Sequence, residues 1–212
     1  MRKTKVNPVI GIDEVGRGPL AGPVTVCAVY LKDSISAKRE YFDDSIRDSK
    51  KLSLARRNNI YLIIRKNRKI NNIDYAVSSR SAEHVDKYGV NNSIHSCIIS
   101  CLNKLKEKGI DINHIKINLD GGLKVKIDNL NQSTHIKGDE NYVEIALASI
   151  IAKITRDKYM KKLANTCKGY GFENNVGYGT KNHIIAIKKL GITKYHRMSY
   201  LKGILSIRKN IK

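Results

Sequence analysis

The amino-acid sequence predicts a single domain of the mixed α/β class. β-prone apolar runs come first in the chain, and segments with helical periodicity follow among further strands, an order that is typical of this class. The pattern indicates several antiparallel neighbours and at least one parallel crossover, although it does not determine the strand order. A length of 212 residues is enough for one well-buried core and short of two typical domains. We therefore expect one domain over residues 1–212.

The first two predicted elements are strands that form a hairpin. Residues 9–13 and 24–31 are apolar and β-prone, and a glycine-rich turn lies between them. Residues 53–68 then predict an amphipathic helix with a cationic outer face, because leucine and isoleucine residues fall at helical intervals among basic ones. Ser53 can cap the start of this helix.

The remaining elements alternate between strands and helices. We expect a strand at residues 73–77, a short helix at 81–88 and a longer helix at 91–108. Apolar and polar residues alternate over residues 115–120, and a glycine pair follows, so this segment predicts a strand that ends at Asp120. After an irregular stretch, residues 142–163 predict one long helix whose small residues suit close packing against a sheet. A loop, a helix at 182–190 and a basic end complete the chain.

The charge balance indicates a protein that binds polyanions. Lys and Arg number 40 against 19 Asp and Glu, which gives a formal net charge of +21 at pH 7. The alternative is that biased codon usage has filled surface positions with lysine. No signal peptide and no long uncharged apolar stretch is present, so we expect a soluble cytoplasmic protein without a membrane span. The four cysteines form no Cys-x-x-Cys pair, so we expect them to pack in the core.

Four acidic residues are candidates for a metal site. Asp13 and Glu14 end an apolar strand, where ionised side chains are costly unless they are paired or metal-bound. Adjacent strand residues point to opposite faces, so both acids can reach one ion only if the pleat relaxes towards Gly16. Asp120 lies at another strand end, and Asp157 lies on the long helix. We expect these acids, from three elements, to converge.

Converging carboxylates are the ligands that Mg²⁺ and Mn²⁺ prefer. Two such ions about 4 Å apart can activate a water and stabilise the leaving oxygen of a phosphodiester. Acids that served only to bind nucleic acid would repel it, so the cluster favours catalysis. The structural alternative is that Asp120 caps a turn and that Asp157 pairs with a neighbouring cation on its helix.

Residues 11–24, Gly-Ile-Asp-Glu-Val-Gly-Arg-Gly-Pro-Leu-Ala-Gly-Pro-Val, resemble the signature opening of ribonuclease HII. The resemblance continues, in the family's order and over nearly the whole chain, at residues 48–53, 119–121, 137–139, 148–157 and 177–180 and around His183, His196 and Arg197. It implies an RNase H-like fold, with a mixed central sheet flanked by helices. It also implies a helical C-terminal part, from about residue 165, that closes over the substrate.

The same resemblance implies roles for particular residues. Asp13, Glu14, Asp120 and Asp157 would be the catalytic, metal-binding set for Mn²⁺ or Mg²⁺. Gly16, Arg17 and Gly18 would approach the ribose 2′-hydroxyl and the adjoining phosphate, Tyr178 would pack on the next sugar, and Lys50, Lys51, Ser149 and Lys153 would contact phosphates. The alternatives are an ordinary glycine turn, a packing tyrosine, and solvated or capping side chains.

The implied activity is that of a metal-dependent endonuclease, a ribonuclease H. It would hydrolyse the RNA strand of RNA/DNA hybrids and incise 5′ of single ribonucleotides in duplex DNA, leaving 3′-hydroxyl and 5′-phosphate ends. The 2′-hydroxyl would provide specificity, because it marks RNA at a given position. We expect a monomer whose partners are these nucleic acids. The basic tail, residues 202–212, is either a solvated terminus or a docking segment for a replication clamp.

Two other function classes remain open at this point. A non-catalytic nucleic-acid-binding protein would need only the charge, and it would leave the acidic cluster unexplained. A different nuclease of the same fold would share the acids and lack the 2′-hydroxyl sensor. A metal titration separates the first alternative from a ribonuclease, and an all-DNA substrate separates the second.

Overall fold

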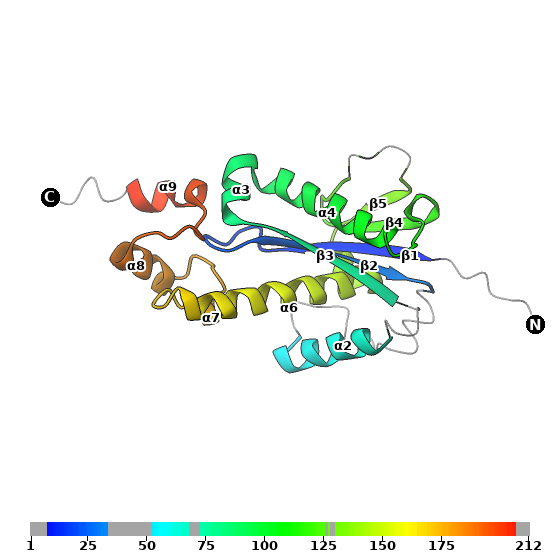
Figure 1. The fold of residues 1–212 in the computed structure, drawn as a ribbon, viewed down its shortest axis with the longest axis horizontal. Coiled ribbons are helices and arrows are strands. Elements are labelled where there is room, and N and C mark those ends of the chain that lie inside the picture. Colours follow the sequence, from blue (N-terminus) through cyan, green and yellow to red (C-terminus); the bar gives the residue numbers. More distant parts are fainter. Residues whose placement is uncertain (1–7, 34–51, 68–72, 126, 128–129, 207–212) are drawn as a thin grey trace, which may run out of the picture.

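A mixed β-sheet lies at the centre of the computed structural model, which describes residues 8–33, 52–67, 73–125, 127 and 130–206 (Figure 1). Within these residues five strands pair in the order β3-β2-β1-β4-β5. The strands are β1 (Val9–Val15), β2 (Val24–Leu31), β3 (Ile73–Arg80), β4 (Lys116–Asp120) and β5 (Gln132–His135). The β1, β2 and β3 strands pair antiparallel, whereas β4 pairs parallel with both β1 and β5. The predicted mixed α/β class is confirmed.

Helices cover both faces of this sheet. They are α2 (Leu54–Asn67), α3 (Ala82–Tyr88), α4 (Val90–Lys106), the 3-10 turn η3 (Ile112–His114), α5 (Gly138–Asn141), α6 (Val143–Thr166), α7 (Phe172–Asn175), α8 (Lys181–Leu190) and α9 (Met198–Ser206). One hydrophobic cluster joins α4 to the sheet, and a second joins α6 and α2 to the opposite face (Figure 1). The side chains of β1 alternate between these clusters, since Ile10 and Ile12 face α4 and Val9 faces α6.

The long helix α6 contacts the sheet very closely at Gly11. A Cβ atom on Gly11 would lie 2.2 Å from the main-chain carbon of Glu144, so only glycine fits there. Buried alanines on the same helix, among them Ala148 and Ala152, complete this contact. The packing explains why the small residues of α6 lie against the sheet, as predicted. It also holds one face of α6 directly above β1.

The C-terminal part packs as a third hydrophobic cluster at the far end of α6. Phe172, Ile187 and Leu201 are buried there with Met160 of α6 and Leu20 of the loop after β1. The N-terminus of α9 is capped by Asp86 of α3, whose carboxylate accepts hydrogen bonds from the main-chain N–H groups of Met198 and Ser199. This end of the chain is therefore attached to both the sheet loop and α3.

Several elements differ from the sequence expectations, among them β1, β5 and α9. The β1 strand does not end at Asp13, because regular pairing with β2 continues to Val15. The β5 strand lies in the stretch expected to be irregular, and its sequence Gln-Ser-Thr-His has no apolar alternation to indicate it. The α9 helix lies in the expected basic end, and its cap comes from Asp86, far away in the sequence.

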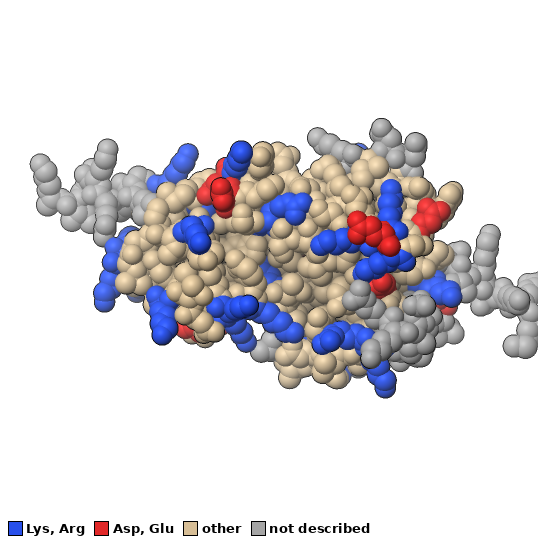
Figure 2. All heavy atoms as spheres, viewed as in Figure 1, with Lys and Arg blue, Asp and Glu red and all other residues tan. Residues whose placement is uncertain are grey.

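Basic side chains are spread over the face of the molecule seen in Figure 2, with acidic side chains in small groups among them. Three cysteines, Cys27, Cys97 and Cys101, are buried, and all four are free thiols, in agreement with a packing role. None of the helices within the described ranges combines the length and the apolarity that a membrane span needs.

Candidate active site

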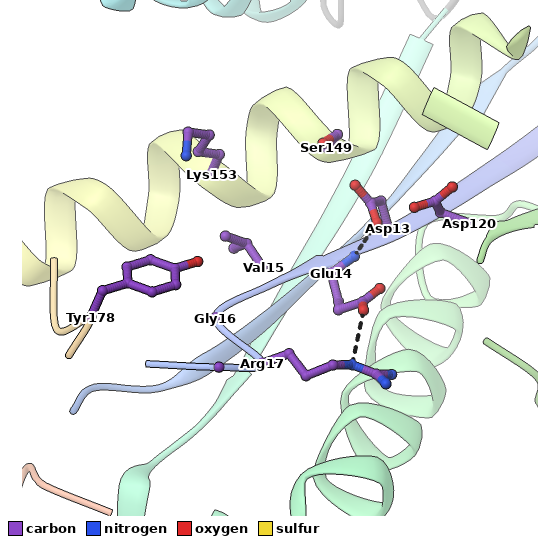
Figure 3. Close-up of a pocket in the computed structure, with 10 residues that line it drawn as sticks. Asp13, Glu14, Val15, Gly16, Arg17, Asp120, Ser149, Lys153 and Tyr178 are labelled. Carbon is purple, nitrogen blue, oxygen red and sulfur yellow. Dashed lines mark hydrogen bonds and ion pairs between the residues drawn. The ribbon is translucent and has the colours of Figure 1, made fainter. Parts of the chain in front are cut away.

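A cavity of about 350 Å³ opens where β1 ends beside β4 and α6 (Figure 3). Its walls are formed by Asp13, Glu14, Val15, Gly16, Arg17, Gly18, Asp120, Ser149, Lys153 and Tyr178. Most of the predicted site residues thus line one cavity, although they come from two strands, a loop, a helix and the C-terminal part. Lys50 and Lys51, for which phosphate contacts were predicted, lie outside the described residues.

Two of the predicted acids lie at the carboxyl ends of neighbouring parallel strands. Ile12 of β1 pairs with Leu119 of β4, so the following residues, Asp13 and Asp120, lie side by side. In Figure 3 their carboxylates point towards each other beneath Ser149 of α6. The Ser149 hydroxyl hydrogen-bonds the Asp13 carboxylate, and Asp120 accepts the main-chain N–H of Gly138 at 2.7 Å. Both carboxylates are therefore held in place by neutral donors.

Asp13 is buried close to two other carboxyl groups, those of Glu14 and Asp120. Burial raises the pKa of the Asp13 carboxyl group well above its ordinary value, and the neighbouring Glu14 and Asp120 raise the pKa further. Asp13 is only 5% exposed. An ionised carboxylate in this position is costly unless a cation compensates it. The cavity thus has the electrostatic character of a cation site.

Glu14 follows Asp13 on β1, which pairs regularly with β2 as far as Val15. Its carboxyl group lines the same cavity and interacts electrostatically with Asp13 and Asp120. The expectation that both Asp13 and Glu14 reach one ion stays a prediction. The Glu14 carboxylate forms an ion pair with Arg17, with Oε1 3.2 Å from Nε. Burial raises the pKa of Glu14, and Arg17 opposes this rise. Glu14 lines the cavity from below, as Figure 3 shows.

The acids fit an open Mg²⁺ or Mn²⁺ site better than a closed one. Within the described ranges, no three His, Cys, Asp or Glu side chains form a ready-made metal cage. Mg²⁺ commonly keeps several waters and is bound through one or two carboxylates together with substrate phosphates. Asp13 and Asp120, with Glu14 beside them, match that donor set.

The structure does not bring the fourth predicted acid, Asp157, to this cavity. Asp157 lies eight residues after Ser149 on α6, which corresponds to a rise of about 12 Å along the helix axis. It is absent from the residues that line the cavity. Its assignment as a metal ligand stays a prediction, and this position does not support it.

A buried acid that the residue patterns did not single out lies closer to the cluster. Asp139 is 1% exposed and follows Gly138, whose N–H donates to the Asp120 carboxylate. The Lys137-Gly-Asp139 motif marked this segment in the sequence without a role for the acid. The signal that could have found Asp139 is an acid next to a glycine in a segment that returns to the strand end at Asp120.

The glycine-rich loop after β1 contacts the buried guanidinium of Arg156. Gly16 has φ +89°, and a Cβ there would lie 2.4 Å from Arg156 Nε, so a larger residue does not fit. Arg156 is 1% exposed and donates to the carbonyls of Pro23 and Ala21 at 2.9 and 3.1 Å. Burial lowers the pKa of Arg156 to about 10. This arginine thus shapes the loop from beneath.

A pair of buried histidines positions Tyr178 at the cavity. The Tyr178 carbonyl lies 2.8 Å from His183 Nδ1, and His183 Nε2 lies 3.2 Å from His196 Nε2. The Thr193 N–H donates to His196 Nδ1 at 3.0 Å, so this nitrogen carries no proton. His196 Nε2–H then donates to His183, and His183 Nδ1–H donates to the tyrosine carbonyl. Burial lowers the pKa of both histidines, to about 4 for His196.

Lys153 and Ser149 lie one helical turn apart on α6 and both line the cavity. Tyr178 lies at its opposite end, 44% exposed, with the Arg156 guanidinium 5.9 Å from its ring centroid. The cavity therefore has acids at one end, a main-chain loop along its floor, and a cation and an aromatic ring at the other end. This arrangement can hold a divalent cation beside a phosphate and stack or pack a sugar next to it.

Comparisons with known proteins agree with this geometry. The family model described as "Ribonuclease HII" matches residues 10–202. The chain is 44% identical over 200 residues to ribonuclease HII of Fusobacterium nucleatum, covering 93% of this chain and 87% of the relative. It is similar to the solved structure of the PCNA:RNase HII complex from Archaeoglobus fulgidus, with a TM-score of 0.71, 26% identity, and 89% and 93% of the two chains covered. Bst-RNase HIII in complex with Mn²⁺ shares the fold, with a TM-score of 0.69, 20% identity, and 99% and 72% covered.

Proposed function

Because the chain belongs to the ribonuclease HII family, and is thus an RNase H-type endonuclease for RNA/DNA hybrids, we propose that it also incises duplex DNA at single ribonucleotides. The incision would fall 5′ of the ribonucleotide and leave 3′-hydroxyl and 5′-phosphate ends. The observation that carries this proposal is the position of Gly16, Arg17 and Gly18 directly beside Asp13 in one cavity. A sugar bound against this main chain would present its adjoining phosphate to the acids.

The proposed metal ligands are Asp13, Glu14 and Asp120, with Mn²⁺ or Mg²⁺ as the cation. When bound, such a cation lowers the pKa of a coordinated water and neutralises charge on the phosphate. For a fourth ligand we favour Asp139, because it is buried next to the residue that binds Asp120. Asp157 remains the alternative that the family resemblance suggested. Substitution of each acid by Asn distinguishes the two.

The other cavity residues have proposed roles in substrate binding. Ser149 orients Asp13 and, with Lys153, contacts the backbone phosphate, since a hydroxyl and an ammonium are common phosphate partners. Tyr178 packs against the neighbouring sugar with its exposed ring face. Lys50 and Lys51, which lie outside the described residues, are also proposed to contact phosphates. The 2′-hydroxyl would be recognised by the main chain of the glycine-rich loop.

The proposed partners are RNA/DNA hybrids and ribonucleotide-containing DNA duplexes. The net charge of +21 supports contacts that are mainly with phosphates, so binding should weaken steeply with salt. The Archaeoglobus fulgidus relative was solved in complex with PCNA, so association with a replication clamp is a second proposal for this chain. We also propose that the enzyme acts in the cytoplasm as a monomer.

The experiment that tests the main proposal uses the purified protein and a DNA duplex with one internal ribonucleotide. We expect incision 5′ of the ribonucleotide with Mn²⁺ or Mg²⁺, no product in EDTA, and no cleavage of the matched all-DNA duplex. The Asp13→Asn variant should bind the duplex and leave it intact. Tight binding without incision under any metal would instead indicate a nucleic-acid-binding protein, and cleavage of the all-DNA duplex would indicate a nuclease without a 2′-hydroxyl sensor.

A further inference from the structure

Arg197 is a fully buried arginine beneath the glycine-rich loop. Its relative exposure is 0%, and its guanidinium donates four hydrogen bonds to main-chain carbonyls of the loop. Nη2 lies 2.6 Å from the Gly16 carbonyl and Nη1 lies 2.9 Å from the Arg17 carbonyl, while Nε and Nη2 lie 3.2 and 3.0 Å from Gly22 O. The side chain of Tyr200 also interacts with this guanidinium.

These contacts determine which way the loop's N–H groups point. In a trans peptide the N–H and C=O groups point in opposite directions, and the described chain has no cis peptide. Because the Gly16 and Arg17 carbonyls point to the buried guanidinium, the N–H groups of Arg17 and Gly18 point away from it. Both residues line the cavity, and no atom within 4 Å would meet a Cβ on Gly18. Two successive N–H groups with this direction form a binding site for an oxygen acceptor.

Tyr200 of α9 adds a second donor to the same carbonyl. Its hydroxyl donates to the Arg17 carbonyl at 3.0 Å, and its ring lies 5.2 Å from the Arg197 guanidinium carbon. Asp86 of α3 caps the same helix at Met198 and Ser199. The direction of the Arg17 peptide thus depends on Arg197, 180 residues later in the chain, and on the helix α9 that follows it.

Simple packing does not account for an arginine in this position. A buried guanidinium is costly, whereas burial of an apolar side chain is favourable, so packing alone would not select an arginine here. A planar guanidinium instead orients several carbonyls at once, which neither an apolar side chain nor a lysine ammonium can do. Arg156 holds the later carbonyls, of Ala21 and Pro23, and so shapes the other end of the loop.

We propose that Arg197 is a positioning residue for substrate recognition, which directs the N–H groups of Arg17 and Gly18 at the ribonucleotide. The acceptor is an oxygen of that nucleotide, its 2′-hydroxyl or the phosphate beside it. This inference rests on the proposed function, since it concerns the same cavity. It assigns specificity in this cavity to a side chain that never contacts the substrate.

The test measures two constants for each variant under turnover conditions with Mn²⁺. The first is KM for a duplex with a single ribonucleotide, and the second is Ki for the matched all-DNA duplex as a competitive inhibitor. For Arg197→Lys we expect KM to rise about tenfold, towards Ki, and Ki to stay unchanged. A tenfold change is the loss expected for one hydrogen bond to a charged or strongly polar group. A variant that is merely less stable has fewer active molecules, which lowers the apparent kcat and leaves both constants unchanged.

Two further variants keep the test decisive. Tyr200→Phe removes one donor to the Arg17 carbonyl and retains the ring, so it should raise KM by about threefold without changing Ki. It replaces Arg197→Lys as the deciding variant if the latter does not fold. Arg80→Lys is the matched control, because Arg80 donates to Ser78, Ser96 and Ser100 between β3 and α4, outside the cavity. It should leave the ratio of KM to Ki unchanged.

The outcomes separate this inference from the proposed function. If the wild-type enzyme does not incise the ribonucleotide duplex, the proposed function fails before any variant is compared. If the wild type incises it and the ratio of KM to Ki is the same in Arg197→Lys and Tyr200→Phe as in the wild type, Arg197 is structural and this inference is wrong. A ratio of KM to Ki that rises in both variants and not in Arg80→Lys supports it.

Discussion

Two regions of this molecule bury charge, and they differ in what compensates it. At the end of β1 and β4, Asp13 and Asp120 share their surroundings with Glu14. Burial and the charges of Glu14 and Asp120 raise the pKa of Asp13, and Asp120 also raises the pKa of Glu14. Beneath the adjoining loop, Arg156 and Arg197 are equally buried, and main-chain carbonyls accept their hydrogen bonds. Burial shifts the pKa of both groups towards the neutral form.

This difference indicates that the carboxylates, and not the guanidinium groups, are available to bind a ligand. The guanidinium groups are compensated by carbonyl dipoles of their own chain, so they stabilise one loop conformation. The carboxylates receive a few neutral hydrogen bonds and repel one another, so they need a cation from outside. Removal of a charge should therefore have opposite effects on stability in the two regions.

Asp13→Asn should abolish cleavage and stabilise the metal-free protein. Activity should fall by about a thousandfold or more, because a bound metal ion contributes several kcal/mol to transition-state stabilisation. The melting temperature without metal should rise by about 2–4 °C, which corresponds to about 1 kcal/mol for a chain of this size. Added Mn²⁺ should raise the melting temperature of the wild type and not that of the variant. A variant that melts below the wild type in EDTA would contradict the view that repulsion is uncompensated there.

The two candidates for the fourth acid should differ strongly. Asp139→Asn should lower kcat/KM by about a hundredfold, whereas Asp157→Asn should change it by less than about threefold. The measurement is single-ribonucleotide cleavage at several Mn²⁺ concentrations, with melting temperatures to exclude unfolding. Equal losses would restore Asp157 to the metal site, and the reverse order would remove Asp139 from it.

Two glycines of the same loop should respond differently to alanine. Gly16→Ala places a Cβ 2.4 Å from Arg156 Nε at a φ of +89°, so it should destabilise the protein by about 1–3 kcal/mol and displace the loop. Gly18→Ala meets no atom within 4 Å and should leave the melting temperature within about 1 °C of the wild type. Thermal melting of the pair measures how tightly the buried arginine determines the loop. Equal melting temperatures would show that the Arg156 side chain can move to accommodate the added Cβ at little cost in stability.

Acid should weaken the histidine pair that supports Tyr178. The folded-state pKa of His183 and of His196 is lowered, to about 4 for His196, so both are neutral in the fold and the unfolded chain binds more protons. Their contribution to stability is fully present above the ordinary histidine pKa of about 6.5 and is lost as the pH falls from there towards 4. His196→Asn keeps an acceptor for the Thr193 N–H, so its melting temperature should fall less between pH 7 and pH 5. If the melting temperature of His196→Asn depends on pH as that of the wild type does, the histidine pair is not the source of the acid sensitivity.

The stability of the acid cavity should depend on pH with the opposite sign. The raised pKa of Asp13 means that its ionised form is costly in the fold, and this cost decreases as the pH falls through the raised pKa. In EDTA, the Asp13→Asn variant should therefore lose more stability than the wild type as the pH is lowered. Melting temperatures of Asp13→Asn and His196→Asn, measured against pH, separate the contributions of the acid cavity and of the histidine pair.

Elements whose burial follows a local pattern could be predicted from the amino-acid sequence alone. The strands at residues 24–31 and 115–120, the long helix after Tyr142, and the acids Asp13 and Asp120 at strand ends were readable from periodicity and chain breaks. The glycine motif located the loop, since a positive φ at Gly16 needs that residue type. These features depend on neighbours within a few residues, so a local pattern is sufficient to predict them.

Which charged side chains lie close together depends on the tertiary fold. Asp139 lies near Asp120 because α5 returns to the end of β4, while Asp157 lies two helical turns away from Ser149. Arg197 would be assigned to the surface from its residue type, yet it is buried because α9 docks on α3 through Asp86 and covers the loop. The energy of a charge depends on the groups packed around it, and these come from distant parts of the chain. Local sequence patterns do not contain information about these distant groups. The groups that compensate each buried charge are therefore known only from the folded structure.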